Sequence, residues 1–422
     1  MIFQPVSHLL KSPRPVIPLL ALLFLLQGAA PQSDATVSVP KEGALRLGIL
    51  LDFSGALGEH GPIGRNAAEL AARQINKAGG VLGRPLELYF ADGQTDPTAS
   101  VAAARTLLEN DKVHALVGAM GSASTLAIAR QVTIPARIPI ISPTSTAPEI
   151  SQLADDDFVF RATYSDSAQG PVLAQLVKDE GHKSAAVIYR DDPYGRGLYQ
   201  SVAEHLGEGF VKGLAITEEK DSYLPELRGL AGNSVLVLLT YPLETEILVR
   251  EALEAKLFHN FAFADSTRIA DLMNRIDPVA LEGVKGTSPA LRDGLEQPST
   301  RAYLEAYRDA YGVVPTFGPG ASVYDSVVCF ALAAEKAGSA KNTAIRDALR
   351  PVCAGPGEEH TAQSLAAALE AVRHGTKINY QGAFSTVDWN SAGDVANGYV
   401  DVWKFSKGKI DSEKLVSFDL GR

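Results

Sequence analysis

Short apolar runs and longer stretches with helical periodicity alternate along most of the chain. The run 45–51 (LRLGILL) is almost wholly apolar, as expected of a strand buried on both faces. In the stretch 62–80, apolar residues recur at helical spacing until Gly79 and Gly80 end the helix. Asp96 is placed to cap a further helix. The same alternation predicts strands at 85–92, 113–118, 139–144, 184–189, 210–216, 234–239 and 261–264, and helices at 96–110, 167–180, 194–207 and 243–256.

Strands that alternate with helices in this way predict βαβ units and parallel sheets. The pattern restarts after Phe160, and 422 residues exceed the roughly 250–300 at which a single core stops growing. We therefore expect an α/β protein with two doubly wound domains. The last part of the chain predicts helices at 299–312, 321–338 and 342–352, a loop at 355–360, and two hairpins with turns at Asn390–Gly393 and Lys407–Gly408.

The N-terminus has the pattern of a secretory signal. Lys11 and Arg14 precede an apolar stretch, 17–30, that ends in small residues. The stretch is shorter than the roughly 20 residues of a membrane span, although an uncleaved anchor is the alternative. We expect residues 1–30 to be removed, 31–44 to form a tether, and the mature protein to be periplasmic.

Charge and cysteine content narrow the function further. The formal net charge is −10 and no basic run occurs, which argues against a nucleic-acid partner. Cys329 and Cys353 are the two cysteines, and an exported pair suggests a disulfide, with two unlinked thiols as the alternative. A metal site is not expected, because no His lies near the two cysteines at a useful spacing and His360 alone is a weak signal.

Sequence motifs of catalysis are missing. Ser122 in VGAMGSASTLAIA (117–129) lacks the second glycine of a nucleophile elbow, and no phosphate loop, dinucleotide fingerprint or H-E-x-x-H motif occurs. We therefore expect no enzyme activity and no cofactor. Ligands of open α/β sheets bind beyond the carboxyl ends of the strands, and free N–H groups where a helix begins attract anions. Ser122 therefore indicates a carboxylate site, with a simple N-cap as the alternative.

Several segments together resemble the periplasmic leucine/isoleucine/valine-binding proteins of ABC transporters. They are GILLDFSGALGEHGPIGRNAAELAARQINKAGGVLGRPLEL (48–88), VGAMGSASTLAIA (117–129), ISPTSTAPEI (141–150), FRATYSDSAQG (160–170) and IYRDDPYGRGL (188–198). The resemblance runs from about residue 45 to 405. It implies two Rossmann-like lobes that close on a ligand like a flytrap, joined by three hinge crossovers near 163–166, 285–289 and 396–400. It places the first lobe at 45–164 and 289–396, and the second at 165–288 and 397–422.

The resemblance also assigns roles at the polar end of a ligand site. Ser122 matches the serine that grips the ligand carboxylate, and Thr146 matches the threonine that assists it and faces the ammonium. Thr144 matches a position whose backbone carbonyl accepts from the ammonium. Asp265 falls where the family has an acid paired with the ammonium, and here it is Asp rather than Glu. The alternative for Asp265 is a helix N-cap.

The remaining assignments concern the walls of the site. Tyr194 and Tyr241 match aromatic residues of the second lobe, although Tyr194 could be a core-edge residue and Tyr241 could shape the turn before Pro242. His60 matches an aromatic lining position, with a solvated loop residue as the alternative. Met120 replaces an apolar lining residue, with simple filler as the alternative. His60 and Tyr164 alter the expected lining.

These assignments imply a monomeric solute-binding protein. It would capture a branched-chain or related amino acid, or another small carboxylate, and deliver it to the permease subunits of an ABC transporter. The alternative is a sensory subunit for amides, urea or aromatic acids that signals to a membrane partner.

Overall fold

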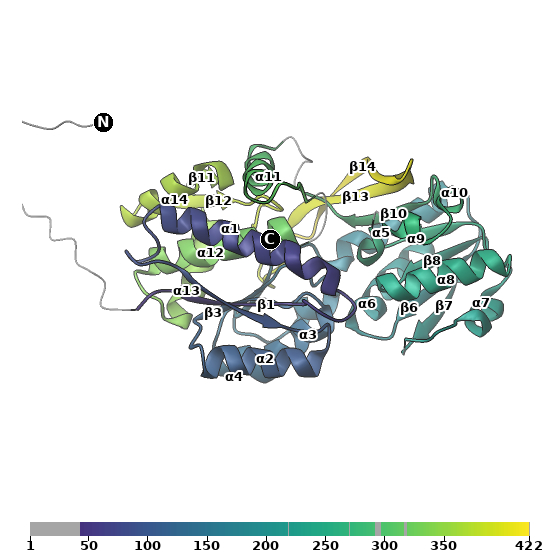
Figure 1. Ribbon diagram of the computed structural model, residues 1–422, viewed down its shortest axis with the longest axis horizontal. Coiled ribbons are helices and arrows are strands. Elements are labelled where there is room, and N and C mark those ends of the chain that lie inside the picture. The colour runs from purple at the N-terminus through teal and green to yellow at the C-terminus, as the bar shows by residue number, and fades with distance from the viewer. Residues whose placement is uncertain (1–42, 218, 270, 292–296, 316–318, 422) are drawn as a thin grey trace, which may run out of the picture. The chain divides into compact units, whose positions relative to one another are not determined.

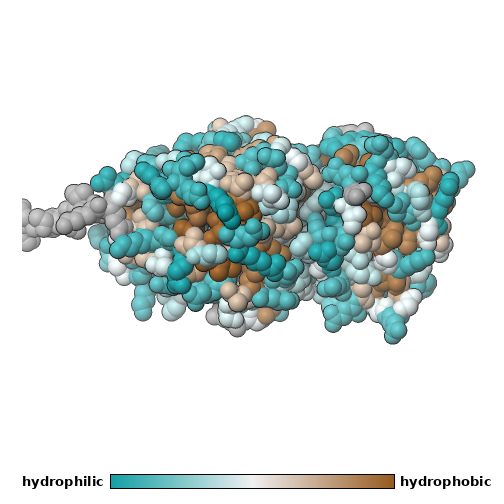
Figure 2. Space-filling view, turned by 90° about the horizontal axis from the view of Figure 1, so that it is seen from below, coloured by the Kyte–Doolittle hydropathy of each residue, from teal (hydrophilic) through white to brown (hydrophobic). Residues whose placement is uncertain are grey.

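The computed structural model describes residues 43–421 apart from 218, 270, 292–296 and 316–318. The predicted signal (1–30) and nearly all of the predicted tether (31–44) lie outside the described residues. Within the described part of the chain, none of the helices is both long and apolar enough to pass through a bilayer. Polar side chains cover most of the face in Figure 2, and apolar residues show in smaller areas between them.

Five parallel strands form the first sheet, in the order β2–β1–β3–β4–β5 (Figure 1). The central strands are buried apolar runs, because helices cover both faces of a parallel sheet. The strands are β1 (Arg46–Leu51), β2 (Glu87–Asp92), β3 (Ala115–Gly118), β4 (Ile140–Ser142) and β5 (Val159–Arg161). The helical segments between them are η1 (Gly58–His60), α1 (Gly61–Lys77), α2 (Pro97–Glu109), α3 (Ser122–Ile128), the π-helical turn η2 (Ala129–Thr133), α4 (Ile134–Ala136) and η3 (Pro148–Gln152).

The second sheet has seven strands in the order β14–β13–β10–β9–β8–β6–β7. All pairs are parallel except those that β13 makes with β10 and β14. The strands are β6 (Ala185–Arg190), β7 (Val211–Ile216), β8 (Val235–Leu239), β9 (Phe261–Phe263), β10 (Lys285–Pro289), β13 (Asn397–Ser406) and β14 (Lys409–Asp419). The helical segments are α5 (Asp166–Asp179), α6 (Pro193–Leu206), α7 (Leu224–Leu230), α8 (Pro242–Glu254), η4 (Asp265–Thr267), α9 (Leu272–Arg275) and α10 (Pro278–Leu281).

The C-terminal helices return to the first sheet. Helix α12 packs along α1, and its apolar residues join the same core cluster as β1 and β3 (Figure 1). Every residue from Gly320 to Ala334 in α12 is buried. The elements of this section are α11 (Pro298–Tyr311), α12 (Gly320–Ala337), α13 (Asn342–Cys353), η5 (Ala362–Ser364), α14 (Leu365–Arg373) and the parallel pair β11 (Glu358–Thr361) and β12 (Ile378–Gln381).

The chain passes three times between the two sheets, after β5, after β10 and after β12. We call the five-stranded sheet with α1–α4 and α11–α14 the first lobe, and the seven-stranded sheet with α5–α10 the second lobe. This confirms the predicted fold class, two α/β lobes rich in parallel strands. The division at individual residues that the sequence predicted stays a proposal.

Two local predictions for the C-terminal section were wrong. Residues 358–360, predicted as loop, form most of β11, since they pair in parallel with β12. Of the two predicted hairpins only β13–β14 forms, turning at Lys407–Gly408 with both φ angles positive, as a tight hairpin turn requires. The Asn390–Gly393 turn is present, but its flanks make a single bridge, Trp389 with Val395.

The two cysteines lie side by side in the core of the first lobe. Cys329 on α12 and Cys353 on α13 are fully buried, unlinked thiols whose Sγ atoms are 3.2 Å apart. Burial, reinforced by the contact with Cys353, raises the pKa of the Cys329 thiol well above its usual value. The predicted disulfide stays a prediction.

We expect the pair to be oxidised in protein isolated from an oxidising compartment. Under denaturing conditions without reductant, a thiol reagent should then label no cysteine, whereas the reduced sample should take up two labels. Two labels without reductant would show that the thiols stay free.

Candidate functional site

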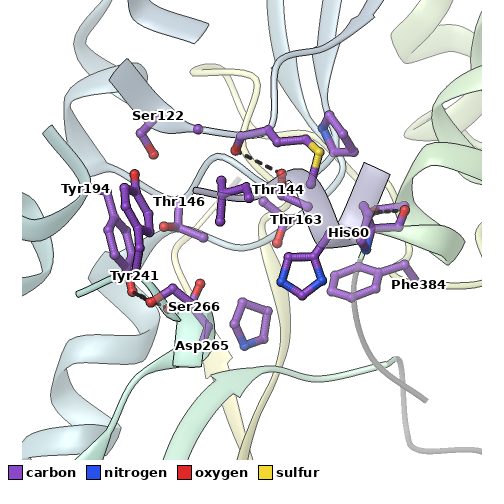
Figure 3. A pocket seen from close by; sticks show the side chains of 17 residues that line it. His60, Ser122, Thr144, Thr146, Thr163, Tyr194, Tyr241, Asp265, Ser266 and Phe384 are labelled. Carbon is purple, nitrogen blue, oxygen red and sulfur yellow. Dashed lines mark hydrogen bonds between the residues drawn. The ribbon is translucent and has the colours of Figure 1, made fainter. Parts of the chain in front are cut away.

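All eight residues predicted from the sequence to bind a ligand line one cavity of about 710 Å³. It lies where the carboxyl ends of β3 and β4 in the first lobe face those of β8 and β9 in the second, as expected for open α/β sheets. Its lining is Leu57, His60, Met120, Gly121, Ser122, Pro143, Thr144, Thr146, Thr163, Tyr194, Tyr241, Asp265, Ser266, Pro289, Pro319, Ser322 and Phe384 (Figure 3).

Ser122 reaches the cavity from the loop after β3. It is the first residue of α3, and Gly121 holds the N-cap position, so the N-cap interpretation of Ser122 was wrong. The Ser122 Oγ accepts a hydrogen bond from the Ala147 amide at 3.2 Å. This contact joins the loops after β3 and β4 and leaves the Ser122 hydroxyl proton available to a ligand.

Thr144 and Thr146 follow β4 and are held firmly. The Thr144 Oγ1 donates to the Met120 carbonyl at 2.9 Å. The Thr146 carbonyl accepts from Arg161 Nη1 and from the Asp166 amide, both at 2.9 Å. These bonds fix the backbone of the loop, so both threonines line a preformed wall.

Two stacked tyrosines form the wall of the second lobe (Figure 3). The rings of Tyr194 and Tyr241 lie 5.9 Å apart at an interplanar angle of 8°. The Tyr241 hydroxyl donates to Asp192 Oδ2 at 3.1 Å, and the Arg190 guanidinium lies over the Tyr241 ring at 5.3 Å. Arg190 is itself paired with the buried Glu244. Tyr241 is therefore held from two sides.

Asp265 lies at the base of the tyrosine wall and is partly exposed, with the cavity beside it. It is the first residue of η4 and makes no capping bond there, so the N-cap interpretation was wrong. Its Oδ1 accepts from the Tyr194 hydroxyl at 2.8 Å and from Gln169 Nε2 at 3.2 Å. Burial raises the pKa of Asp265, and these two hydrogen bonds lower it in part.

His60 and Phe384 lie opposite the two tyrosines in Figure 3. His60 ends η1 and is only partly exposed, so it is not a fully solvated loop residue. Burial lowers its pKa, which favours the neutral ring. Met120 is buried, and its Sδ accepts from the Asp52 amide at 3.2 Å. This end of the cavity is mostly apolar.

The geometry matches a known family. The sequence model of the periplasmic binding protein family matches residues 44–353, well over half of the chain. The chain belongs to the periplasmic binding protein family.

Relatives of this binding protein agree with that assignment. It is 28% identical over 316 residues to the leucine-, isoleucine-, valine-, threonine- and alanine-binding protein of Pseudomonas aeruginosa, covering 72% of this chain and 82% of the relative. It is 25% identical over 380 residues to a chemotactic signal transduction substrate-binding protein of Halobacterium salinarum, covering 88% and 89%. The fold matches a leucine-binding protein of Thermotoga maritima with a TM-score of 0.75 at 22% identity, covering 88% and 99%.

About half of the residues that line the cavity of this binding protein were not predicted from the sequence. Gly121, Pro143 and Ser266 are direct neighbours of predicted residues, and the strand-end rule could have found them. Ser322 and Phe384 come from the C-terminal section, where no strand end indicates a site. The other missed residues are Leu57, Thr163, Pro289 and Pro319.

The prediction that Tyr164 is part of the cavity lining is corrected by the structure. Tyr164 does not line the cavity but packs in the core, with its ring 5.4 Å from that of Phe384 and 4.9 Å from that of Phe418. Tyr164 lies close to the predicted first crossover. There its ring is buried against the rings of Phe384 and Phe418 and is not exposed to the cavity. Tyr164 contacts the lining residue Phe384 from behind the cavity wall.

The cavity of this binding protein is chemically divided. Hydroxyl groups line the side of the first lobe, and a carboxylate lies on the side of the second lobe. Among the described lining residues the only basic side chain is His60, which burial keeps towards its neutral form. The described residues contain no cluster of His, Cys, Asp and Glu that could hold a metal ion. The family is that of periplasmic binding proteins, and the fold matches that of a leucine-binding protein.

Proposed function

We propose that this chain captures an amino acid, branched-chain or related, outside the cytoplasm and delivers it to an ABC transporter permease. The observation that carries the proposal is one cavity with hydroxyls on one wall and Asp265 on the other. A zwitterion needs both of its charges satisfied when water is excluded. The two walls offer a partner for each charge.

The carboxylate end is assigned to Ser122 and Thr146. Both hydroxyls can donate to a carboxylate, and the adjacent first turn of α3 offers backbone N–H groups without helical acceptors. Hydroxyl and amide donors make a site for a carboxylate that uses no lysine or arginine. Such a site suits a ligand whose overall charge is zero.

The ammonium end is assigned to Asp265, with the Thr144 carbonyl as a second acceptor. Asp265 already accepts from Tyr194 and Gln169, so its oxygens are oriented before a ligand arrives. A charge-assisted bond from the ligand would replace solvation that the carboxylate has lost on burial. Aspartate is one methylene shorter than glutamate, so the lobes close further or a water bridges.

The side chain of the ligand would contact Tyr194, Tyr241, His60, Met120 and Phe384. Aromatic and thioether groups provide apolar area without fixed polar partners, so aliphatic side chains fit this lining best. The neutral form of His60 is compatible with an apolar neighbour.

Binding is coupled to closure through contacts from the second lobe. A ligand held first by Ser122 and Thr146 gains Tyr194, Tyr241 and Asp265 when the lobes close. Only contacts that differ between the open and the closed state shift their balance. The two lobes contact each other in this structure, for example through the ion pair of Arg275 with Glu59 at 3.4 Å.

The cellular setting is part of the proposal. The family is periplasmic by description, and residues 1–30 have the sequence pattern of a secretory signal. We infer a monomer that is exported, loses this segment, and presents the closed lobes to a permease. The lobe boundaries predicted from the sequence, 45–164 with 289–396 and 165–288 with 397–422, belong to this proposal.

The proposal is tested by thermal-shift screening against a panel of amino acids and organic acids. We expect leucine, isoleucine or valine to raise the melting temperature in proportion to the logarithm of ligand concentration over its dissociation constant. Ser122→Ala should reduce the shift, whereas Ser124→Ala should not, because Ser124 is equally buried on α3 but does not line the cavity. A panel in which no amino acid raises the melting temperature would contradict the proposal.

A sensory role is the second candidate, and the Halobacterium salinarum relative favours it, since that relative is a substrate-binding protein of a chemotactic signal transduction system. The binding site would be the same, and the membrane partner would differ. Neighbouring genes for two permeases and two ATPases would support transport, whereas a neighbouring kinase or cyclase gene would support sensing.

A further inference from the structure

A second carboxyl group lies behind the ligand cavity. Asp166 is the first residue of α5 and has no exposed surface. Neither oxygen of its carboxyl group makes a hydrogen bond within the described part of the chain. An ionised carboxylate without partners is costly to bury, so this group calls for a proton or a cation.

Asp166 lies beside Asp265. Residues three apart share a face of a helix, and Gln169, three residues after Asp166, donates its Nε2 to Asp265 Oδ1 at 3.2 Å. The Asp166 amide donates to the carbonyl of the lining residue Thr146 at 2.9 Å. Asp166 therefore lies between the loop of the first lobe that carries Thr146 and the acid of the second lobe.

The arginines on the strands before and after α5 already have partners. Arg161 on β5 is bonded to Asp394, and Arg190 on β6 to Glu244. The ion pairs of these two arginines are with Asp394 and Glu244 and not with Asp166.

Among the residues that the structure describes, the other elements packed against α5 add no unpaired buried cation. From α6 come Tyr194 and, just before it, Asp192, which caps that helix by accepting from the Gly195 amide. At the matching end of β10 the buried residues are the uncharged Thr287 and Ser288. On β13 the buried Asp401 is paired with Arg268 at 2.9 Å, and the charged side chains of β14 are exposed.

The two carboxyl groups oppose each other's ionisation. Burial first, and then the charge of Asp265, raise the pKa of Asp166 well above its usual range, although the proximity of the Thr146 side chain and the charge of Arg161 lower it in part. Burial raises the pKa of Asp265 as well. Two adjacent carboxyl groups in a low dielectric retain a proton that two separated ones would lose.

We propose that Asp166 and Asp265 together hold one proton in the ligand-free protein, and that the ammonium group of the ligand displaces it into solvent. This rests on the proposed function and adds the ligand class, because a small carboxylate without a protonated amine cannot displace the proton. Asp166 acts as a specificity-determining residue through Asp265. Charge balances, since one cation enters the pair as one proton leaves.

Calorimetry with leucine measures the released proton. The binding enthalpy is determined at one pH in two buffers of different ionisation enthalpy, and the difference gives the number of protons released. We expect a net release approaching one proton at pH values below the shared pKa. Affinity should then rise with pH, approaching tenfold per pH unit, because binding favours the deprotonated pair. Leucine binding without proton release and without pH dependence would overturn the inference.

The Asp166→Asn variant locates the effect. It keeps Asp265 as the partner of the ammonium, so leucine should still bind, but proton release should fall towards zero and the pH dependence should flatten. Asp155→Asn is the matched control, because Asp155 also has a pKa raised by burial but does not line the cavity. Undiminished proton release by Asp166→Asn would contradict the assignment.

Two further measurements separate this inference from the proposed function. Infrared spectra of the ligand-free protein at neutral pH should show a protonated carboxyl band in the wild type that is missing from Asp166→Asn, whether or not leucine binds. The probe 4-methylpentanoate, which is leucine without its amine, should bind far more weakly than leucine. If leucine fails to bind but the band is present, the proposed ligand is wrong and the shared proton stands. If the band is absent, the shared proton is wrong.

Discussion

Replacing Asp265 with alanine is expected to weaken amino-acid binding by about 2–5 kcal/mol, or roughly 30-fold to several thousand-fold. The loss is large because the ammonium would be enclosed in the cavity without its charged partner. The Tyr194 hydroxyl loses its acceptor on Asp265 but keeps its contact with Ser266 Oγ at 2.8 Å, so the wall itself should persist.

Isothermal calorimetry with the tightest amino acid from the screen provides the measurement. Asp309→Ala is the control, since it removes the same charge from an exposed position on α11. The control should bind as the wild type does. An Asp265→Ala protein that melts normally and binds with unchanged affinity would remove Asp265 from the site.

Replacing Asp394 with alanine is expected to destabilise the protein by about 3–5 kcal/mol, because it leaves the buried Arg161 charge without a partner. Arg161 has no exposed surface and uses its whole guanidinium. Its Nε and Nη2 donate to Asp394 Oδ1 at 2.8 and 2.5 Å, its Nη1 donates to the Thr146 and Ala147 carbonyls at 2.9 Å, and its Nη2 also donates to Ser151 Oγ at 2.6 Å.

Chemical denaturation followed by circular dichroism measures this loss. Glu149→Ala is the matched control, because Glu149 pairs with Arg130 at 2.8 Å where both side chains are more than 40% exposed. Exposed pairs contribute about 0–1 kcal/mol, so the control should unfold nearly as the wild type does. Equal destabilisation by the two substitutions would show that burial of the Arg161–Asp394 pair is unimportant.

The fold was predictable where periodicity was strong. The strand predicted at 234–239 is observed at Val235–Leu239. Its five consecutive apolar residues are all buried, as is typical of a strand covered on both faces of a parallel sheet. The cap predicted at Asp96 is present, with its carboxylate accepting from the Ala99 amide at 2.7 Å. The short β11 was missed because its first two residues are exposed glutamates, and its pairing with β12 depends on tertiary contacts.

The candidate site was predictable where residues follow strand ends. Ser122 and Asp265 come directly after β3 and β9, and the resemblance assigned them roles that spacing alone left open. Phe384 could not be found in this way. Its position depends on Asp325 of α12, which accepts from the Phe384 amide at 2.8 Å. A buried acid that anchors a distant loop has no local sequence pattern.

The return of the chain to its first lobe affects how the protein can be assembled. Helix α12 covers a sheet whose last strand, β5, ends at Arg161, so the sheet is synthesised long before its cover. Until α12 emerges, this face of β1 and β3 has α1 to pack against but lacks α12. The core of the first lobe is therefore complete only after most of the second lobe has been synthesised.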